Sequence, residues 1–229
     1  MSGSGLFSDQ GPLKPHLLRG TGGLQAEVAD LRRDVGKTVE ALAALTVEEF
    51  IDPAAADTDA VLASVVSQAA AAVYESGDLV GGAAVDLDPP RNVTLTCDAG
   101  GGATWTGNLK VIGLDANGAA LEEDIAFTAS ATTPGAKAFA KVTKLEADAQ
   151  NDALGNWEVG FGDIIGLGKP LVSRAGLAAV TREVAVGVVV TTGTFEDAAT
   201  NPPNGTYEPA TAPGGGNDYA LYYEYDPTA

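Results

Sequence analysis

Short stretches in which apolar and polar residues alternate, separated by glycine or proline, run through the chain from Pro89 to its last residues. Alternation places every second side chain on the same face of an extended strand, so each stretch predicts a β-strand with one buried face. Many short strands with frequent turns are typical of a β-sandwich or jelly-roll fold, and the predicted fold class is therefore mainly β. We expect strands over 92–97, 109–114, 121–128, 137–145, 156–161, 182–194 and 218–225.

The composition favours the same class. The 229 residues include 29 glycines and 12 prolines, which favour turns, and only 6% of the residues are aromatic. A core made from this chain must use small and β-branched side chains. The most specific local pattern is a hairpin, because the strands Leu109–Leu114 and Leu121–Thr128 flank Asp115-Ala-Asn-Gly118, a sequence typical of a tight turn.

The first fifty residues predict a different organisation. Residues 1–23 are rich in glycine, serine and proline and are expected to form an irregular arm. Residues 24–50 predict an amphipathic helix, because apolar residues recur at spacings of three and four. Such a seam serves equally for a coiled coil between copies or for packing on the chain's own domain. The predicted capsid or oligomer contacts are Leu6, Phe7, Leu13, Leu17 and Leu18 in the arm, and Leu24, Val28, Leu31 and Val35 in the helix.

Residues 51–88 connect this region to the β domain, which we place at 89–229. Asp52-Pro53 ends the helical pattern, and residues 59–76 allow either a helix or a strand. We favour strands there, because Gly77 and Gly81-Gly82 bound the segment as hairpin turns would.

The charge restricts the classes of partner. The formal net charge is −18, which repels nucleic-acid phosphates and anionic membrane surfaces. Neither a signal peptide nor a transmembrane helix is recognisable in the sequence. Cys97 is the single cysteine, so an intrachain disulfide is impossible and folding in a reducing cytoplasm is expected.

No pattern in the sequence predicts a catalytic, cofactor or metal site, and we expect the protein not to be an enzyme. His16, the single histidine, lies in the predicted arm, whereas a triad or zinc site needs histidine on a rigid scaffold. Cys97 falls on the apolar face of its strand and is expected to be buried. Glu122 and Asp124 share one face of a strand, expected to be solvated, and Asp115–Gly118 predicts a turn rather than a calcium loop.

Tyrosines cluster at the C-terminal end. In the strand 218–225, alternation places Tyr219, Leu221, Tyr223 and Tyr225 on one face and Tyr222 on the other. Tyr222 is therefore the candidate surface aromatic, which could stack on a sugar or lie in a subunit interface. Packing of the whole cluster in the core and its rim is the alternative.

Seven stretches together resemble a group of structural proteins of tailed-bacteriophage virions, of the capsid decoration (cement) or head-fibre type. They are residues 89–96 (PPRNVTLT), 111–118 (VIGLDANG), 135–139 (GAKAF), 159–168 (VGFGDIIGLG), 191–195 (TTGTF), 204–207 (NGTY) and 217–226 (NDYALYYEYD). The resemblance implies a virion component on the capsid surface, made in the bacterial host cytoplasm. It also implies binding to the major capsid protein and to copies of itself, as a homotrimer or alternatively a dimer.

The residues and the resemblance lead to one expectation. The arm and helix would attach the chain to the capsid or to its own copies, and the β domain would decorate or stabilise the shell without catalysis. A receptor- or carbohydrate-binding fibre or tail component is one alternative, for which Tyr222 would be the binding residue. A hydrolase on a β scaffold is the other, which a deep cleft with two facing carboxylates would favour.

Overall fold

The structure is a computed structural model, and its described residues all belong to one compact unit, Ala43–Ala229. The described residues are 44–98, 100, 105–150, 155–171, 182–185, 188–190, 193–196, 201, 203–214 and 218–225. The predicted arm and most of the predicted helix lie outside them, together with all nine predicted contact residues between Leu6 and Val35.

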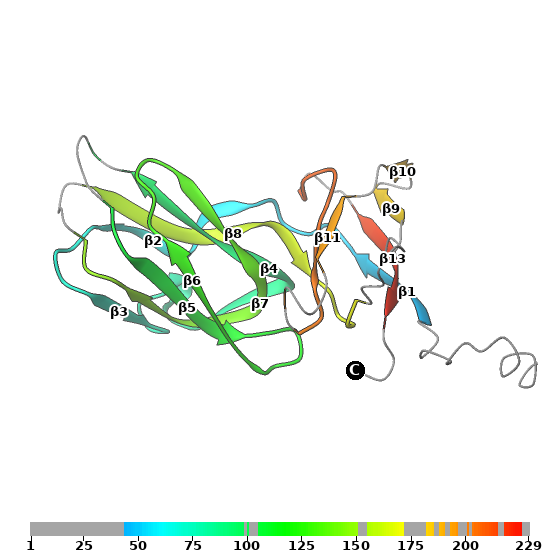
Figure 1. The fold of residues 1–229 in the computed structure, drawn as a ribbon, viewed down its shortest axis with the longest axis horizontal. Coiled ribbons are helices and arrows are strands. Elements are labelled where there is room, and N and C mark those ends of the chain that lie inside the picture. The colour runs from blue at the N-terminus through cyan, green and yellow to red at the C-terminus, as the bar shows by residue number, and fades with distance from the viewer. Residues whose placement is uncertain are drawn as a thin grey trace, which may run out of the picture. The chain divides into compact units, whose positions relative to one another are not determined.

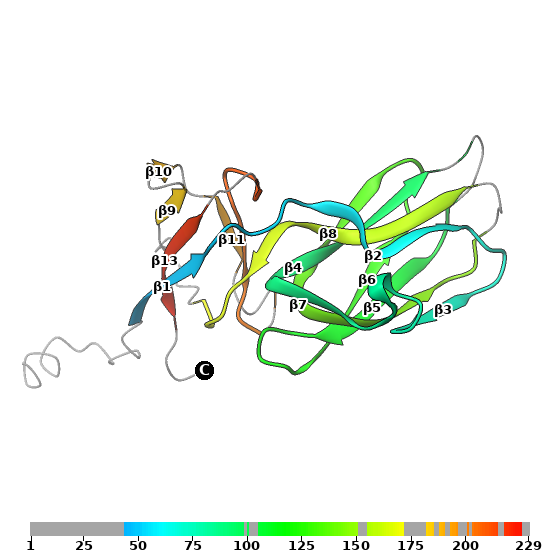
Figure 2. The same cartoon turned by 180° about the vertical axis from the view of Figure 1, so that it is seen from behind.

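Antiparallel strands dominate the fold, which confirms the mainly β prediction (Figures 1 and 2). A nine-stranded sheet has the order β11-β12-β8-β4-β7-β5-β6, with β2 paired to β8 and β3 paired to β7; a four-stranded sheet has the order β1-β13-β9-β10. The strands of the large sheet are β2 (Asp57–Val66), β3 (Ala72–Glu75), β4 (Val85–Asp98), β5 (Asn108–Leu114), β6 (Ala120–Ala126), β7 (Thr132–Ala147), β8 (Asn156–Gly166), β11 (Thr194–Glu196) and β12 (Thr206–Glu208). Those of the small sheet are β1 (Ala44–Phe50), β9 (Arg182–Ala185), β10 (Val188–Val190) and β13 (Tyr219–Tyr225), and a 3-10 turn, η2 (Val80–Gly82), lies between β3 and β4.

The large sheet curls into a half-barrel around its own apolar face, whereas the sequence pattern predicted two facing sheets. Its core contains Leu95, Leu109, Phe139, Leu145 and Val159, none of which is exposed. The pairings of β4 with both neighbours, and of β5 with β7, shift register along their length. Such bulges bend a strand and increase its twist, so they curl one sheet where regular strands would stack two.

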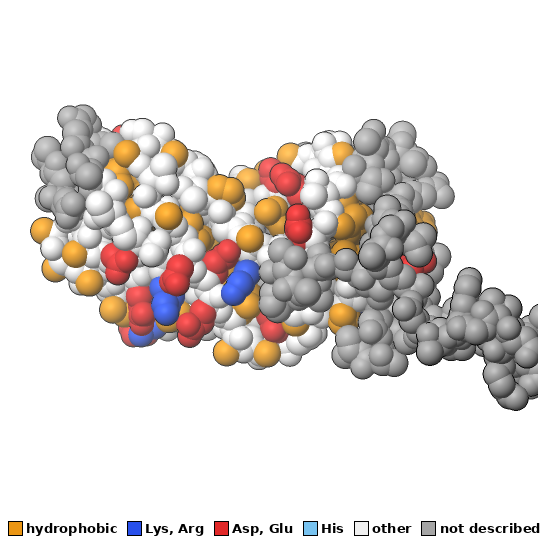
Figure 3. Space-filling view, viewed as in Figure 1, with side chains coloured by type: hydrophobic (Ala, Val, Ile, Leu, Met, Phe, Trp, Pro, Cys, Tyr) orange, Lys and Arg blue, Asp and Glu red, His pale blue; other side chains and the backbone are white. Residues whose placement is uncertain are grey.

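The outer face of the large sheet carries ion pairs, some between neighbouring strands and one within β7. Lys141 pairs with Asp86 at 2.8 Å, and Lys144 lies 3.6 Å from Glu75 and 2.8 Å from Glu146. Figure 3 shows acidic and basic side chains lying side by side on this part of the surface. These pairs are solvated, so each contributes little to the stability of the fold.

The small sheet corrects the predicted helix of residues 24–50 at its C-terminal end. Residues 44–50 form β1, which pairs with β13 from Ala44 opposite Tyr225 to Phe50 opposite Tyr219. The heptad spacing ends at Leu45, and the following residues Thr46, Val47 and Phe50 are β-branched or aromatic. The tyrosine strand supplies the partner that overrides the local helical preference. Beneath this sheet lies a second cluster of Leu167, Leu171, Tyr207, Leu221 and Tyr223.

The other strand predictions are confirmed with one exception. Residues 59–76 contain β2 and β3, and β5 and β6 form the expected hairpin. The single strand predicted over 182–194 is wrong, because β10 folds back antiparallel on β9 and β11 joins the large sheet. Gly187 falls between β9 and β10 in the sequence, and glycine favours such a reversal.

Candidate functional site

Two bulges meet at the same level of the central strand β4. On the β8 side, Arg91 lies opposite Ile165 and Val93 opposite Phe161, so residues 162–164 face a single β4 residue. On the β7 side, Asn92 lies opposite Ala138 and Thr94 opposite Pro134, so residues 135–137 also face one residue. We call these two segments, with Arg91 and Asn92 between them, the double bulge. Bulges leave backbone polar groups without a ladder partner, and side chains must satisfy them.

Arg91 satisfies the carbonyl of the β8 bulge. Its side chain is 2% exposed, its Nε donates to the Gly162 oxygen at 2.8 Å, and its Nη2 donates to the same oxygen. Its Nη1 donates to the Ala54 oxygen at 2.9 Å. Since Ala54 lies between β1 and β2, Arg91 ties the connection between the two sheets to the large sheet.

The positive charge of Arg91 has a nearby counterion and an aromatic neighbour. Asp163, within the β8 bulge, lies 3.6 Å from Nη2, and the guanidinium lies 5.2 Å from the centroid of the Phe161 ring. Burial lowers the pKa of Arg91, and the charge of Asp163 opposes that change. Arginine nevertheless stays protonated in proteins, so a buried cation is part of the fold.

Asn92 connects the two bulges through one carboxamide. The residue is 1% exposed. Its Nδ2 donates to the Gly135 oxygen of β7 at 3.0 Å, and its Oδ1 accepts from the Ile164 nitrogen of β8 at 3.0 Å. Asparagine is suited to this position because its side chain carries both a donor and an acceptor.

Glu123 of β6 completes the double bulge on its outer side. Its carboxylate accepts from the Ala136 nitrogen at 2.7 Å and from the Lys137 nitrogen at 3.3 Å. Burial raises the pKa of Glu123, although the bonds from Ala136 and Lys137 act against that rise. The side chain is half-buried, in contrast to the exposed Glu122 and Asp124 on either side of it.

A separate polar cluster holds β1 in the small sheet, and we call it the β1 anchor. The Glu48 carboxylate accepts from the Tyr223 hydroxyl at 2.6 Å and from the Gly168 nitrogen at 2.9 Å. The Lys169 nitrogen donates to the Tyr223 hydroxyl at 3.2 Å, and the Lys169 ammonium lies 4.4 Å from the centroid of the Tyr225 ring. Burial, followed by the hydrogen bond and charge of Glu48, raises the pKa of Tyr223. The hydroxyl therefore stays protonated and donates to Glu48.

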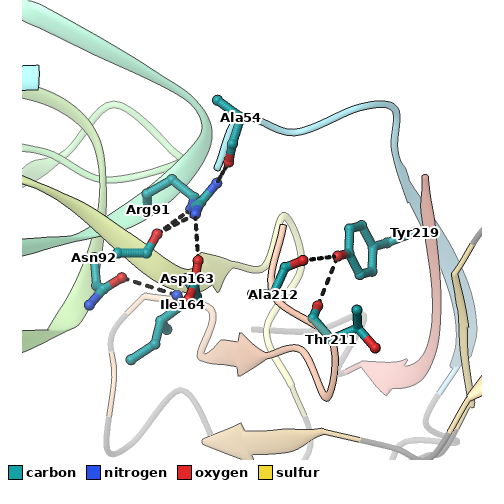
Figure 4. A network of polar contacts seen from close by, with 9 residues as sticks. Ala54, Arg91, Asn92, Asp163, Ile164, Thr211, Ala212 and Tyr219 are labelled. Carbon is teal, nitrogen blue, oxygen red and sulfur yellow. Dashed lines mark hydrogen bonds and ion pairs between the residues drawn. The ribbon is translucent and has the colours of Figure 1, made fainter. Parts of the chain in front are cut away.

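The C-terminal tyrosines alternate as predicted. Tyr219, Leu221 and Tyr223 are buried, whereas Tyr222 is half-buried on the opposite face of β13. Val47, opposite Tyr222 on β1, is 46% exposed. The Tyr219 hydroxyl donates toward the carbonyl oxygens of Thr211 and Ala212, at 2.8 and 2.9 Å (Figure 4).

The other residues considered for chemistry have structural surroundings. Cys97 is buried on the apolar face of β4, as predicted, and burial raises the pKa of its thiol to about 11. Asp115 accepts from the Asn117 and Ala119 nitrogens at 2.7 and 3.0 Å, which stabilises the turn between β5 and β6. The described residues contain no group of three or more His, Cys, Asp or Glu suited to a metal ion. The same residues include no helix with the length and apolar character needed to cross a membrane.

The sequence patterns did not identify Arg91, Asn92, Glu123 or Glu48 as linked residues. Gly135 and Gly162 lie just outside the predicted strands 137–145 and 156–161, and the observed strands β7 and β8 extend through them. Glycine inside a strand suggests a bulge, so longer predicted strands would have contained that signal. The local sequence pattern did not predict which side chains would hydrogen-bond to the backbone of these bulges.

Comparison with known proteins gives no relative for this chain: no family model, no curated protein and no solved structure matches it.

Proposed function

We propose that the chain is a non-catalytic structural protein of a tailed-phage virion, which attaches through its N-terminal region to the outside of the capsid and decorates or stabilises it. The carrying observation is the β1 anchor. Residues 1–43 precede β1 in the sequence, and seven register pairs with β13 hold that strand in the small sheet. A pull on the N-terminal region is therefore transmitted to the β unit through paired backbone and through Glu48.

The resemblance to virion proteins supports this proposal through particular residues. Three of the resembling stretches, 89–96, 135–139 and 159–168, are the parts of β4, β7 and β8 that form the double bulge. The resemblance thus lies in residues that determine the fold, and not only in common turn sequences.

Decoration requires no chemistry beyond binding. Contacts that exist only on the assembled shell favour that shell by mass action. A protein–protein interface of the size usual in stable complexes is enough for such binding. The partners in this proposal are the major capsid protein and further copies of the chain, as a homotrimer or a dimer. The acidic charge keeps such an abundant protein soluble.

Co-sedimentation with capsids that lack this protein tests the proposal. The full chain should bind saturably, at a stoichiometry that matches a capsid symmetry class. A chain without residues 1–23 should keep its β-type circular dichroism spectrum and lose binding. Absence of binding by the full chain would refute decoration, and equal binding by the shortened chain would refute attachment through the arm.

The β1 anchor can be tested separately with two neighbouring glutamates. Glu48→Ala removes the acceptor for Tyr223 and Gly168, whereas Glu49→Ala changes an exposed residue of the same strand. On capsids, Glu48→Ala should speed proteolytic release of the β unit from the bound N-terminal region, and Glu49→Ala should leave that rate unchanged. Equal release rates would remove the anchor from the proposal.

Recognition of a sugar or receptor is the second candidate, favoured by the position of Tyr222 beside the exposed Val47. Aromatic rings in such positions stack on sugars. Binding on a glycan array that Tyr222→Ala abolishes, together with failure to bind capsids, would favour this function.

A further inference from the structure

The bulge of β7 presents two consecutive backbone N–H groups on the side away from β4. Residues 135–137 have no ladder partner on β4, since Asn92 pairs with Ala138 and the following pair places Thr94 opposite Pro134. On the other side, β5 pairs with β7 only from Lys141 onward. The N–H groups of Ala136 and Lys137 are thus outside both ladders.

These two groups together form the kind of concave donor pair that binds anions. Successive N–H groups that point the same way make an anion-binding nest, and a carboxylate accepts from them more strongly than a neutral oxygen does. Both carboxylate oxygens of Glu123 take part, because the Lys137 nitrogen lies 3.3 Å from each. Gly135 leaves room for the ligand: a Cβ atom there would lie 2.5 Å from Oε2 of Glu123.

The carboxylate that binds these N–H groups belongs to Glu123 of β6, a strand at the edge of the large sheet. In the described residues β6 has β5 as its only ladder neighbour, and open edges need protection against pairing with other chains. Glu123 points inward from this edge, between the buried Leu121 and Ile125. The Lys137 ammonium adds a second link to β6, by donating to the Glu122 oxygen at 2.8 Å.

We propose that the Gly135–Lys137 bulge is a carboxylate-binding site, which Glu123 occupies to hold the edge strand β6 against β7, and which takes up a free carboxylate anion when Glu123 is removed. The site is independent of the proposed capsid attachment. Ala136 is exposed and Lys137 half-buried, so a small anion can reach the N–H groups from solvent.

Formate is the probe, and the Glu123→Thr variant of the full chain supplies the vacant site. Threonine suits an edge strand, and Glu122→Thr is the matched control one residue away on the exposed face. The melting temperature is measured in sodium formate and in sodium chloride at equal ionic strength. Formate should raise the melting temperature of Glu123→Thr in a saturable way and leave wild type and Glu122→Thr unchanged. In 15N-labelled Glu123→Thr, formate should shift the amide signals of Ala136 and Lys137.

Amide signals that stay in place, or a formate effect of equal size in Glu122→Thr, would overturn the proposal. If Glu123→Thr does not fold, Glu123→Gln replaces it, because the carboxamide keeps one acceptor oxygen for Ala136. Formate should then displace the neutral amide and move the same two signals, and signals that do not move would again overturn it.

Discussion

The two bulges beside β4 pose the same physical problem and are satisfied by opposite charges. On the β8 side, the unpaired Gly162 carbonyl is met by the cation of Arg91, in a position that is almost fully buried. On the β7 side, the unpaired N–H groups of Ala136 and Lys137 are met by the anion of Glu123, in a half-buried position. Asn92, between them, donates to a carbonyl oxygen of the β7 bulge and accepts from an N–H group of the β8 bulge.

The difference shows that the unpaired backbone group determines whether the side chain must donate or accept a hydrogen bond. A carbonyl oxygen can only accept, so it needs an N–H donor, and arginine supplies several in a planar fork. A pair of N–H groups can only donate, so it needs acceptor oxygens, and the carboxyl group of Glu123 supplies them. Burial then determines the energetic consequence, because an unsatisfied group costs more where water cannot replace the lost partner.

Among the substitutions that test this comparison, replacement of Arg91 should lower the free energy of unfolding most. Arg91→Met keeps much of the apolar volume but leaves the Gly162 and Ala54 carbonyls and the Asp163 carboxylate without their donor. Breaking a buried charged network typically costs about 3–5 kcal/mol, and we expect a loss of that size in the free energy of unfolding, measured with urea.

Lys110→Met is the matched control for that measurement. Lys110 is 40% exposed and lies 3.6 Å from Glu122, so its replacement should cost less than about 1 kcal/mol. A similar, small loss for both variants would mean that the β8 bulge does not depend on its buried cation, and the contrast between the two bulges would fail.

Alanine substitutions at the two bulge glycines, Gly162 and Gly135, form a matched pair with an expected stability loss of intermediate size. A Cβ atom on Gly162 would lie 2.7 Å from Oδ1 of the buried Asn92, whereas one on Gly135 would meet Oε2 of the half-buried Glu123. Overpacking of a core costs about 1–3 kcal/mol, and we expect Gly162→Ala to fall in this range. Gly135→Ala should cost less, because the end of the Glu123 side chain can move into solvent. Urea unfolding of both variants decides the order, and the reverse order would contradict it.

Local patterns predicted the strands well where one face is buried. Val93, Leu95 and Cys97 alternate in the sequence and all lie in the core, and the Asp115–Gly118 turn connects β5 and β6 as expected. In both cases the determining residues are neighbours in the chain, so a short window contains the whole signal.

The bulges and the β1 strand depend on residues far away in the chain. Asn92 bonds to residues 43 and 72 positions away, and Glu48 to a tyrosine 175 positions away. A single sequence reports which side chains can donate or accept, but not which unpaired backbone group they will face. For the same reason the predicted helix of residues 24–50 included residues 44–50, because its strand partner β13 lies far away in the chain.

The smallest expected effect concerns the charge of Glu123 and its dependence on pH. Burial raises the pKa of Glu123 above its ordinary value of 4.5, so folding favours the protonated form. The stability that this preference contributes is fully present below pH 4.5 and is lost as the pH rises through the folded-state pKa. Lys137, which attracts the carboxylate, and Asp124, which repels it, are the charged neighbours in this balance.

Glu123→Gln removes this titration and keeps an acceptor for the Ala136 nitrogen. Relative to wild type, the variant should therefore gain stability as the pH rises from about 4.5 to about 7.5, measured as the difference in urea unfolding free energy at each pH. Glu122→Gln, on the exposed face, is the matched control, and a pH trend of equal size in that variant would contradict the assignment to Glu123. If the difference between Glu123→Gln and wild type moved in the opposite direction, the ionised carboxylate would be favoured by the fold at neutral pH. The β7 bulge would then depend on its charge as the β8 bulge depends on Arg91, and the two would differ in sign alone.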